Sequence, residues 1–195
     1  VPSACLTDST QDDFVFGIPV SLDLNSSPGD VTLDKTPLIN QQNITVGTSG
    51  VGITVTTWGG QTFTPSTSGK ITQIDLSLFC SGCTGTTPNL TLSVRATSGG
   101  LPTGADLATA TITGFSSGSI APYTAIFATP LSVVAGTQYA LVIRPTANPS
   151  PGTYALARSG TATAGSDVYS GGARLSGATS GTVWSSPLTG GVSTD

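Results

Sequence analysis

Ile71-Thr-Gln-Ile-Asp-Leu-Ser-Leu-Phe79 shows the alternation of apolar and polar side chains that is typical of a half-buried β-strand. The stretches Leu90-Thr-Leu-Ser-Val-Arg-Ala96 and Gln138-Tyr-Ala-Leu-Val-Ile-Arg144 show the same period of two. No stretch keeps the 3.6-residue period of an amphipathic helix without a Gly or Pro that would break it. These three stretches therefore predict strands of an all-β protein.

Weaker strand signals flank these three stretches on both sides. They cover residues 15–24, 52–57, 61–64, 108–112, 125–127, 153–157 and 167–173. Clusters of Gly, Pro, Ser and Asn separate them, as at residues 27–30, 98–104 and 148–152, and such residues favour turns. Seven or more short strands at this spacing predict an antiparallel β-sandwich of the jelly-roll kind.

Length and composition indicate one domain and argue against nucleic-acid and membrane partners. A chain of 195 residues fits a single sandwich. Charged residues make up only 8% of the chain, against about 25% in an average soluble protein. The six Lys and Arg are scattered and the net charge is -4, so we expect no nucleic-acid partner. No apolar run reaches the length of a transmembrane helix, so we expect no membrane insertion.

Three cysteines are present, and two of them flank a predicted turn. Cys80 and Cys83 lie at positions i and i+3, where the Cα atoms of a β-turn come within reach of a disulfide. A zinc site would need carboxylate ligands in addition to cysteine, because the chain has no His. A redox CxxC motif would need a helix, and none follows. We therefore expect a local disulfide, with Cys5 either free or paired with another chain.

Several segments in order resemble a known family. They are Gln61-Thr-Phe-Thr-Pro-Ser-Thr-Ser-Gly69, Leu101-Pro-Thr-Gly-Ala-Asp-Leu-Ala108, Ala135-Gly-Thr-Gln-Tyr-Ala-Leu-Val142, Tyr169-Ser-Gly-Gly172 and Thr182-Val-Trp184. Together they resemble a jelly-roll accessory domain of large secreted bacterial surface proteins, which is non-catalytic and similar to carbohydrate-binding modules. The likeness is good over residues 58–184 and loose over residues 8–46. We expect one domain over residues 1–195, with loosely matching N-terminal strands at 1–46 and the main sandwich at 47–195.

The same resemblance implies secretion to the cell surface and one further alternating strand after Asp195. The given sequence does not contain that strand, and three explanations stay open. The boundary of the chain cuts the strand off, residues 15–24 supply it instead, or a neighbouring subunit fills the gap.

Catalytic patterns give no support for an enzyme. Gly114-Phe-Ser-Ser-Gly118 matches the G-x-S-x-G nucleophile elbow, but the chain has no His to activate a serine. Ten Asp allow many carboxylate pairs, so pairing alone does not indicate glycoside hydrolysis. We expect a non-catalytic protein.

Carbohydrate binding needs aromatic faces beside hydrogen-bonding side chains. Tyr139 alternates with core positions, so we assign it to the core. The remaining candidates for ligand binding are Trp58, Tyr154, Asp167, Tyr169 and Trp184. For the two tryptophans the sequence favours a structural role, in which each caps one end of the sandwich core.

Two further expectations concern metal and partners. Asp12, Asp13 and Asp30 could hold a structural calcium, since loops of secreted sandwiches use Asp for this purpose; the alternative is a solvated acidic terminus. We expect a polysaccharide or another extracellular polymer as the partner. The alternative function is a structural subunit of an extracellular filament, sheath or surface layer, assembled with identical subunits by strand addition.

Overall fold

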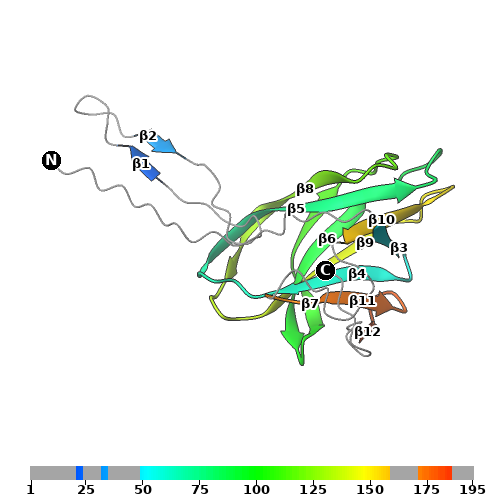
Figure 1. Ribbon diagram of the computed structural model, residues 1–195. Coiled ribbons are helices and arrows are strands. Elements are labelled where there is room, and N and C mark those ends of the chain that lie inside the picture. Colours follow the sequence, from blue (N-terminus) through cyan, green and yellow to red (C-terminus); the bar gives the residue numbers. More distant parts are fainter. Residues whose placement is uncertain (1–20, 24–31, 35–48, 159–170, 186–195) are drawn as a thin grey trace.

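The computed structural model describes residues 49–158 and 171–185 in full, and the backbone of residues 21–23 and 32–34. These ranges contain strands and no helix. Ten of the strands form two antiparallel sheets that face each other across one core (Figure 1). The predicted all-β sandwich is therefore confirmed.

The first sheet has four strands. Their order is β3 (Ser49–Ile53), β10 (Thr153–Arg158), β5 (Gly69–Ser81) and β8 (Ala121–Val133). The second sheet has six strands, in the order β12 (Val183–Ser185), β11 (Arg174–Ala178), β4 (Trp58–Phe63), β9 (Tyr139–Pro145), β6 (Leu90–Ser98) and β7 (Leu101–Ile112). Strands β8 and β7 each pair with one neighbour only and are therefore edges of their sheets.

A small hairpin lies outside both sheets. Strand β1 (Ser21–Asp23) pairs with β2 (Thr32–Asp34) and with no strand of the sandwich. Figure 1 shows this hairpin, in blue, to one side of the two sheets. Of the strand predicted at residues 15–24, the structure describes only β1.

Alternation along the strands fills the core. Inward-facing residues of both sheets form one contiguous buried cluster, which includes Ile74, Leu76 and Leu78 of β5 and Leu90, Leu92 and Val94 of β6. Burying one such side chain contributes about 1.5–3 kcal/mol. Tyr139 is 9% exposed and belongs to this cluster, as predicted.

Several strand boundaries differ from the prediction. Strands β7 and β8 are far longer than the predicted 108–112 and 125–127. The turn predicted at 98–104 shrinks to Gly99 and Gly100, whose φ angles of 59° and 77° suit a two-residue hairpin turn. Pro102 then lies within β7, where a missing N–H is tolerated because β7 is an edge strand.

In the N-terminal part of the sandwich, the strand predicted at residues 52–57 lies at residues 49–53 instead. Strand β3 ends at Ile53, and a turn follows in which the Thr54 N–H donates to the Thr57 carbonyl at 2.7 Å. This turn ends immediately before Trp58, which is the first residue of β4. At the other end of the chain, β11 begins at Arg174, after the predicted strand 167–173.

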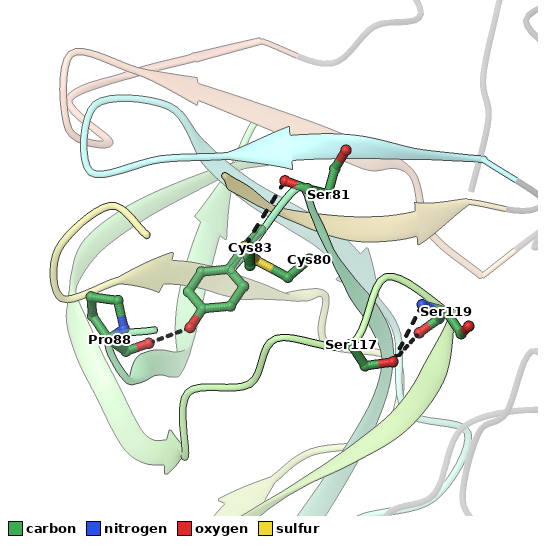
Figure 2. Close-up of a disulfide and its surroundings, with 7 residues drawn as sticks. Cys80, Ser81, Cys83, Pro88, Ser117 and Ser119 are labelled. Carbon is green, nitrogen blue, oxygen red and sulfur yellow. Dashed lines mark hydrogen bonds between the residues drawn. A yellow bond between two sulfur atoms is a disulfide. The ribbon is translucent and has the colours of Figure 1, made fainter. Parts of the chain in front are cut away.

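A disulfide closes one end of the sandwich (Figure 2). Cys80 and Cys83 are bonded, with Cα atoms 5.7 Å apart, which confirms the prediction. Both are buried, and Tyr154 of β10 pairs with Cys80 in register. The Tyr154 hydroxyl donates to the Pro88 carbonyl at 2.7 Å. The disulfide therefore belongs to a packed end of the core. Cys5 lies outside the described residues.

Candidate ligand-binding site

Three of the five residues predicted for ligand binding lie in the described part of the chain. Trp58 is the first residue of β4 and Trp184 the middle residue of β12, so both belong to strands that directly follow a turn. Tyr154 is fully buried and its hydroxyl is already hydrogen-bonded, so its assignment to the ligand site is wrong. Asp167 and Tyr169 lie outside the described residues.

The calcium prediction also concerns residues outside the described ranges. The three predicted calcium ligands, Asp12, Asp13 and Asp30, all lie outside those ranges. Within residues 49–158 and 171–185, no three His, Cys, Asp or Glu side chains lie close enough to hold a metal ion. The sequence motif at 114–118 falls in the connection between β7 and β8, which joins two strands and not a strand to a helix.

Trp58 and Trp184 share the outer face of the six-stranded sheet, which is turned away from the core. Gly177 of β11 is the cross-strand partner of both, and directly paired residues have their side chains on one face. The next residue, Gly59, faces the core, because a Cβ there would lie 2.9 Å from the side chain of Ile53. The two tryptophans therefore do not cap the ends of the core.

Two glycines leave room for the ring of Trp184. A Cβ atom at Gly177 would lie 2.9 Å from Cη2 and Cζ3 of Trp184, and one at Gly60 would lie 3.3 Å from Cζ3. A larger residue at Gly177 would displace the ring, since real Cβ atoms do not approach so closely. The ring in turn meets Trp58 edge to face, with centroids 6.5 Å apart and planes at 65°.

Trp58 is held on several sides. Its indole Nε1–H donates to the Val55 carbonyl at 3.0 Å, and the backbone of Gly181 lies against its six-membered ring. The guanidinium carbon of Arg144 is 4.6 Å from the ring centroid, a cation–π contact. Trp184 is half-exposed, and its indole N–H has no hydrogen-bond partner among the described residues. Trp184 is therefore the more available ring of the two.

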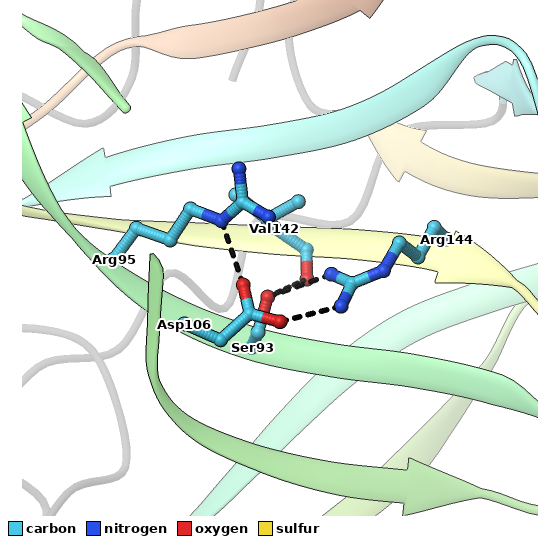
Figure 3. A network of polar contacts seen from close by, with 5 residues as sticks. All are labelled: Ser93, Arg95, Asp106, Val142 and Arg144. Atoms are coloured by element: carbon cyan, nitrogen blue, oxygen red, sulfur yellow. Dashed lines mark hydrogen bonds and ion pairs between the residues drawn. The ribbon is translucent and has the colours of Figure 1, made fainter. Parts of the chain in front are cut away.

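An ion network lies beside Trp58, because the guanidinium groups of Arg95 and Arg144 both lie over its ring. Figure 3 shows the network itself. Arg95 Nε donates to Asp106 Oδ1 and Arg144 Nη2 donates to Asp106 Oδ2, both at 2.6 Å. Arg144 Nη1 also donates to the buried Ser93 hydroxyl at 2.8 Å. One carboxylate thus holds two arginines over the sheet. We refer to Trp58, Arg95, Asp106, Arg144 and Trp184 as the outer-face cluster.

The sequence prediction did not include the three charged residues of this cluster. Arg95 and Arg144 occupy outward positions of strands that alternation predicted correctly. Their location on one common face of the sheet could therefore have been inferred. Asp106 lies opposite an irregularity in the β6–β7 pairing, between Val94 and Ala96. Because the prediction placed Asp106 next to a turn and outside any strand, alternation gave no signal for it.

Asp106 is held in its ionised form. Burial alone would raise the pKa of its carboxyl group. Hydrogen bonds from Arg95 and Arg144, together with the charge of Arg144, outweigh burial and hold the pKa below its ordinary value of 3.8. At neutral pH the cluster therefore has two cations and one anion.

Charge is distributed unevenly along the chain. Residues 49–158 and 171–185 contain five Lys and Arg and two Asp, a formal charge of +3. Residues 1–48 contain six Asp and one Lys, a formal charge of -5. The sandwich is thus positive although the whole chain is negative at -4. The charge of the described sandwich, taken by itself, favours an anion over a cation.

The outer-face cluster brings together the groups that sugar recognition uses. The half-exposed ring of Trp184 offers an apolar face, and the arginines offer donors. Asp106 accepts one bond from an arginine at each oxygen, and a carboxylate can accept about four in all. An aromatic ring is thus adjacent to donors and to an acceptor with free capacity.

Comparisons with known proteins give no further assignment. Neither the models of protein families, nor the curated proteins, nor the solved structures contain a match to this chain. No helix in the described ranges is long and apolar enough to cross a membrane.

Proposed function

We propose that this protein is a non-catalytic extracellular binding module that holds a polysaccharide on the outer face of its six-stranded sheet. One observation carries the proposal. Trp58 and Trp184 lie in edge-to-face contact beside the Arg95–Asp106–Arg144 network, on the side of the sheet away from the core, where Val142 and Leu175 are themselves buried. Stacking on an aromatic ring and hydrogen bonds to hydroxyl groups are the two interactions that a pyranose requires.

Two other features support this proposal. A disulfide between Cys80 and Cys83 suits an oxidising compartment, which is consistent with secretion. The sequence resembles jelly-roll accessory domains of secreted bacterial surface proteins, and the sandwich agrees with that expectation.

Affinity electrophoresis tests the proposed function. The full chain is run through native gels that contain soluble polysaccharides, both neutral and acidic. We expect at least one polymer to retard the protein, and Trp184→Ala to remove the retardation, because it removes the accessible ring.

Phe79→Ala is the matched control. Phe79 is a half-buried aromatic residue of β5 with no place in the outer-face cluster. This variant should be retarded as strongly as the wild-type chain. Failure of every polymer to retard the protein, or equal retardation of Trp184→Ala, would contradict the proposal.

The second candidate function is a subunit that assembles by strand addition. One observation favours it. A groove of ≈ 330 Å³ lies between the edge strands β7 and β8, lined by residues 107–109 and 128–132. Leu107 in this groove is 49% exposed, and each of the two strands has one unpaired edge. An added strand could pair with such an edge.

A further inference from the structure

Arg95 uses only part of its hydrogen-bonding capacity. Its Nε donates to Asp106, while its two terminal nitrogens have no partner among the described residues. No atom of the outer-face cluster is both buried and unpartnered in that part of the chain. The terminal nitrogens therefore reach solvent, and in Figure 3 the upper one is clearly directed away from Asp106.

Arg144 differs from Arg95 in this respect. Both of its terminal nitrogens are occupied, Nη1 by Ser93 and Nη2 by Asp106. Arg144 also lies closer to the Trp58 ring, at 4.6 Å against 5.6 Å for Arg95. Arg144 thus fixes the cluster, and Arg95 is the arginine with donors available to a ligand.

The two terminal nitrogens of a guanidinium form a planar fork that matches a carboxylate group. Asp106 already fixes the side chain of Arg95 through Nε, so little rotamer entropy is lost when a ligand binds to the fork. Only 15% of the Arg95 side chain is exposed. Solvent therefore screens the attraction between its charge and an anion less than it would at a fully exposed arginine. These features favour a bidentate contact with an anion.

The aromatic part of the site lies within reach of the same ligand. Arg95 Cζ is 5.6 Å from the Trp58 ring centroid, and the Trp184 ring is 6.5 Å from that centroid. A short stretch of polysaccharide can therefore stack on Trp184 and contact Arg95 together.

We propose that the polysaccharide held on the outer face is acidic, and that a uronate carboxylate accepts both terminal N–H groups of Arg95. This inference rests on the proposed function. The positive charge of the described sandwich supports it, because it attracts a polyanion and disfavours a cationic polymer.

Isothermal titration calorimetry with two forms of one polymer tests the inference. De-esterified polygalacturonate carries free carboxylates, whereas fully methyl-esterified polygalacturonate has the same backbone without them. We expect the full chain to bind the de-esterified form about tenfold more tightly or better, as befits a charge-assisted bidentate contact. Arg95→Gln should remove this difference.

Two variants control for folding and for general charge. Arg95→Lys keeps the charge and loses the fork, so the preference should fall to an intermediate value even if Arg95→Gln fails to fold. Arg158→Gln removes a cation of β10 in the other sheet, where Arg158 donates to Ser49. It should leave the preference unchanged.

The outcomes separate this inference from the proposed function. Equal binding of both polymers would overturn the inference and leave polysaccharide binding intact. Binding of no polysaccharide would overturn both. Stronger binding of dextran sulfate than of polygalacturonate would assign the fork to sulfate. If Arg158→Gln lost the preference for the de-esterified polymer as fully as Arg95→Gln, the preference would depend on the overall charge of the protein and not on the fork. Self-association that Arg95→Gln abolishes would assign the fork to the acidic residues 1–48 of another copy. Each of these last three outcomes would also overturn the inference.

Discussion

Asp106 is the residue that joins the two arginines of the outer-face cluster. Each of its carboxylate oxygens accepts one of them at 2.6 Å, and its side chain is 20% exposed. An exposed ion pair contributes up to about 1 kcal/mol, and breaking a buried one costs about 3–5 kcal/mol. We expect the contribution of Asp106 to the free energy of unfolding to lie between these limits.

Asp106→Asn should lower the free energy of unfolding by about 1–2 kcal/mol at pH 7, because two arginines lose their anionic partner. The folded-state pKa of Asp106 lies below its ordinary value of 3.8. The stabilisation is therefore complete above that value and is lost as the pH falls through the lower, folded-state pKa. Urea unfolding between pH 3 and pH 8 measures this difference.

Asp75→Asn is the matched control for Asp106. Asp75 is a half-buried carboxylate of β5 that accepts hydrogen bonds from two uncharged residues, Gln73 and Thr124. This substitution should cost less than that of Asp106. A cost of Asp106→Asn that is equal at pH 3 and pH 7, or larger at pH 3, would contradict the account of the network.

Gly177 is the second residue with a specific prediction. Gly177→Ala places a Cβ atom 2.9 Å from the Trp184 ring, so the ring must move away from the sheet. We expect a loss of about 1–3 kcal/mol in stability, as for other overpacked sites, and a red shift of tryptophan fluorescence. Gly69→Ala is the control, because no atom lies within 4 Å of its added Cβ. Unchanged fluorescence in Gly177→Ala would argue against the ring position.

At the scale of elements, the disulfide fixes the turn that follows β5. Replacing Cys80 and Cys83 together by Ser should cost about 2 kcal/mol, the chain-entropy estimate for so short a loop. Thermal unfolding under non-reducing conditions measures the loss. Alkylation of the denatured, unreduced chain should leave Cys80 and Cys83 unlabelled. Labelling of both residues would show that the disulfide does not form in solution.

Strand interiors were predictable from the sequence, and strand ends were not. Alternation located β5, β6 and β9 because every second residue of each is an apolar side chain of the core. The length of β7 depends on its pairing with β6, and its first half faces solvent, so residues 103–105 carry no alternation signal. Tyr154 shows that residue type alone does not reveal burial. The sequence does not distinguish a tyrosine that is free to stack on a sugar from one that is buried beside the disulfide.

The site was only partly predictable for a related reason. Both tryptophans were identified by residue type alone. Their common face and their contact depend on the pairing of β11 both with its sequence neighbour β12 and with the distant strand β4. No local pattern in the sequence encodes such long-range pairing.

At the scale of the whole molecule, the edge strands β7 and β8 that border the groove decide between binding and assembly. Proline occurs in both edge strands, Pro102 in β7 and Pro122 and Pro130 in β8. Proline lacks the N–H that strand pairing requires, and proteins use it to protect sheet edges. Pro130 also lines the groove between these strands. We therefore expect the groove to accept an added strand poorly.

Light scattering over a dilution series tests this expectation. The purified chain should remain a monomer at all concentrations, and negative-stain microscopy of the same samples should show no ordered fibres or sheets. Concentration-dependent growth into fibres would favour the structural-subunit function instead.

The central claim is that the outer face of the six-stranded sheet binds the polysaccharide. Two-dimensional ¹⁵N NMR of the full chain, titrated with oligomers of a polymer that retards it, tests this claim most directly. We predict that the indole N–H signal of Trp184 and the amide signals of β4, β9 and β12 shift with ligand concentration. Shifts confined to the four-stranded sheet around Phe79, or to the β7–β8 groove, with Trp184 unmoved, would contradict it.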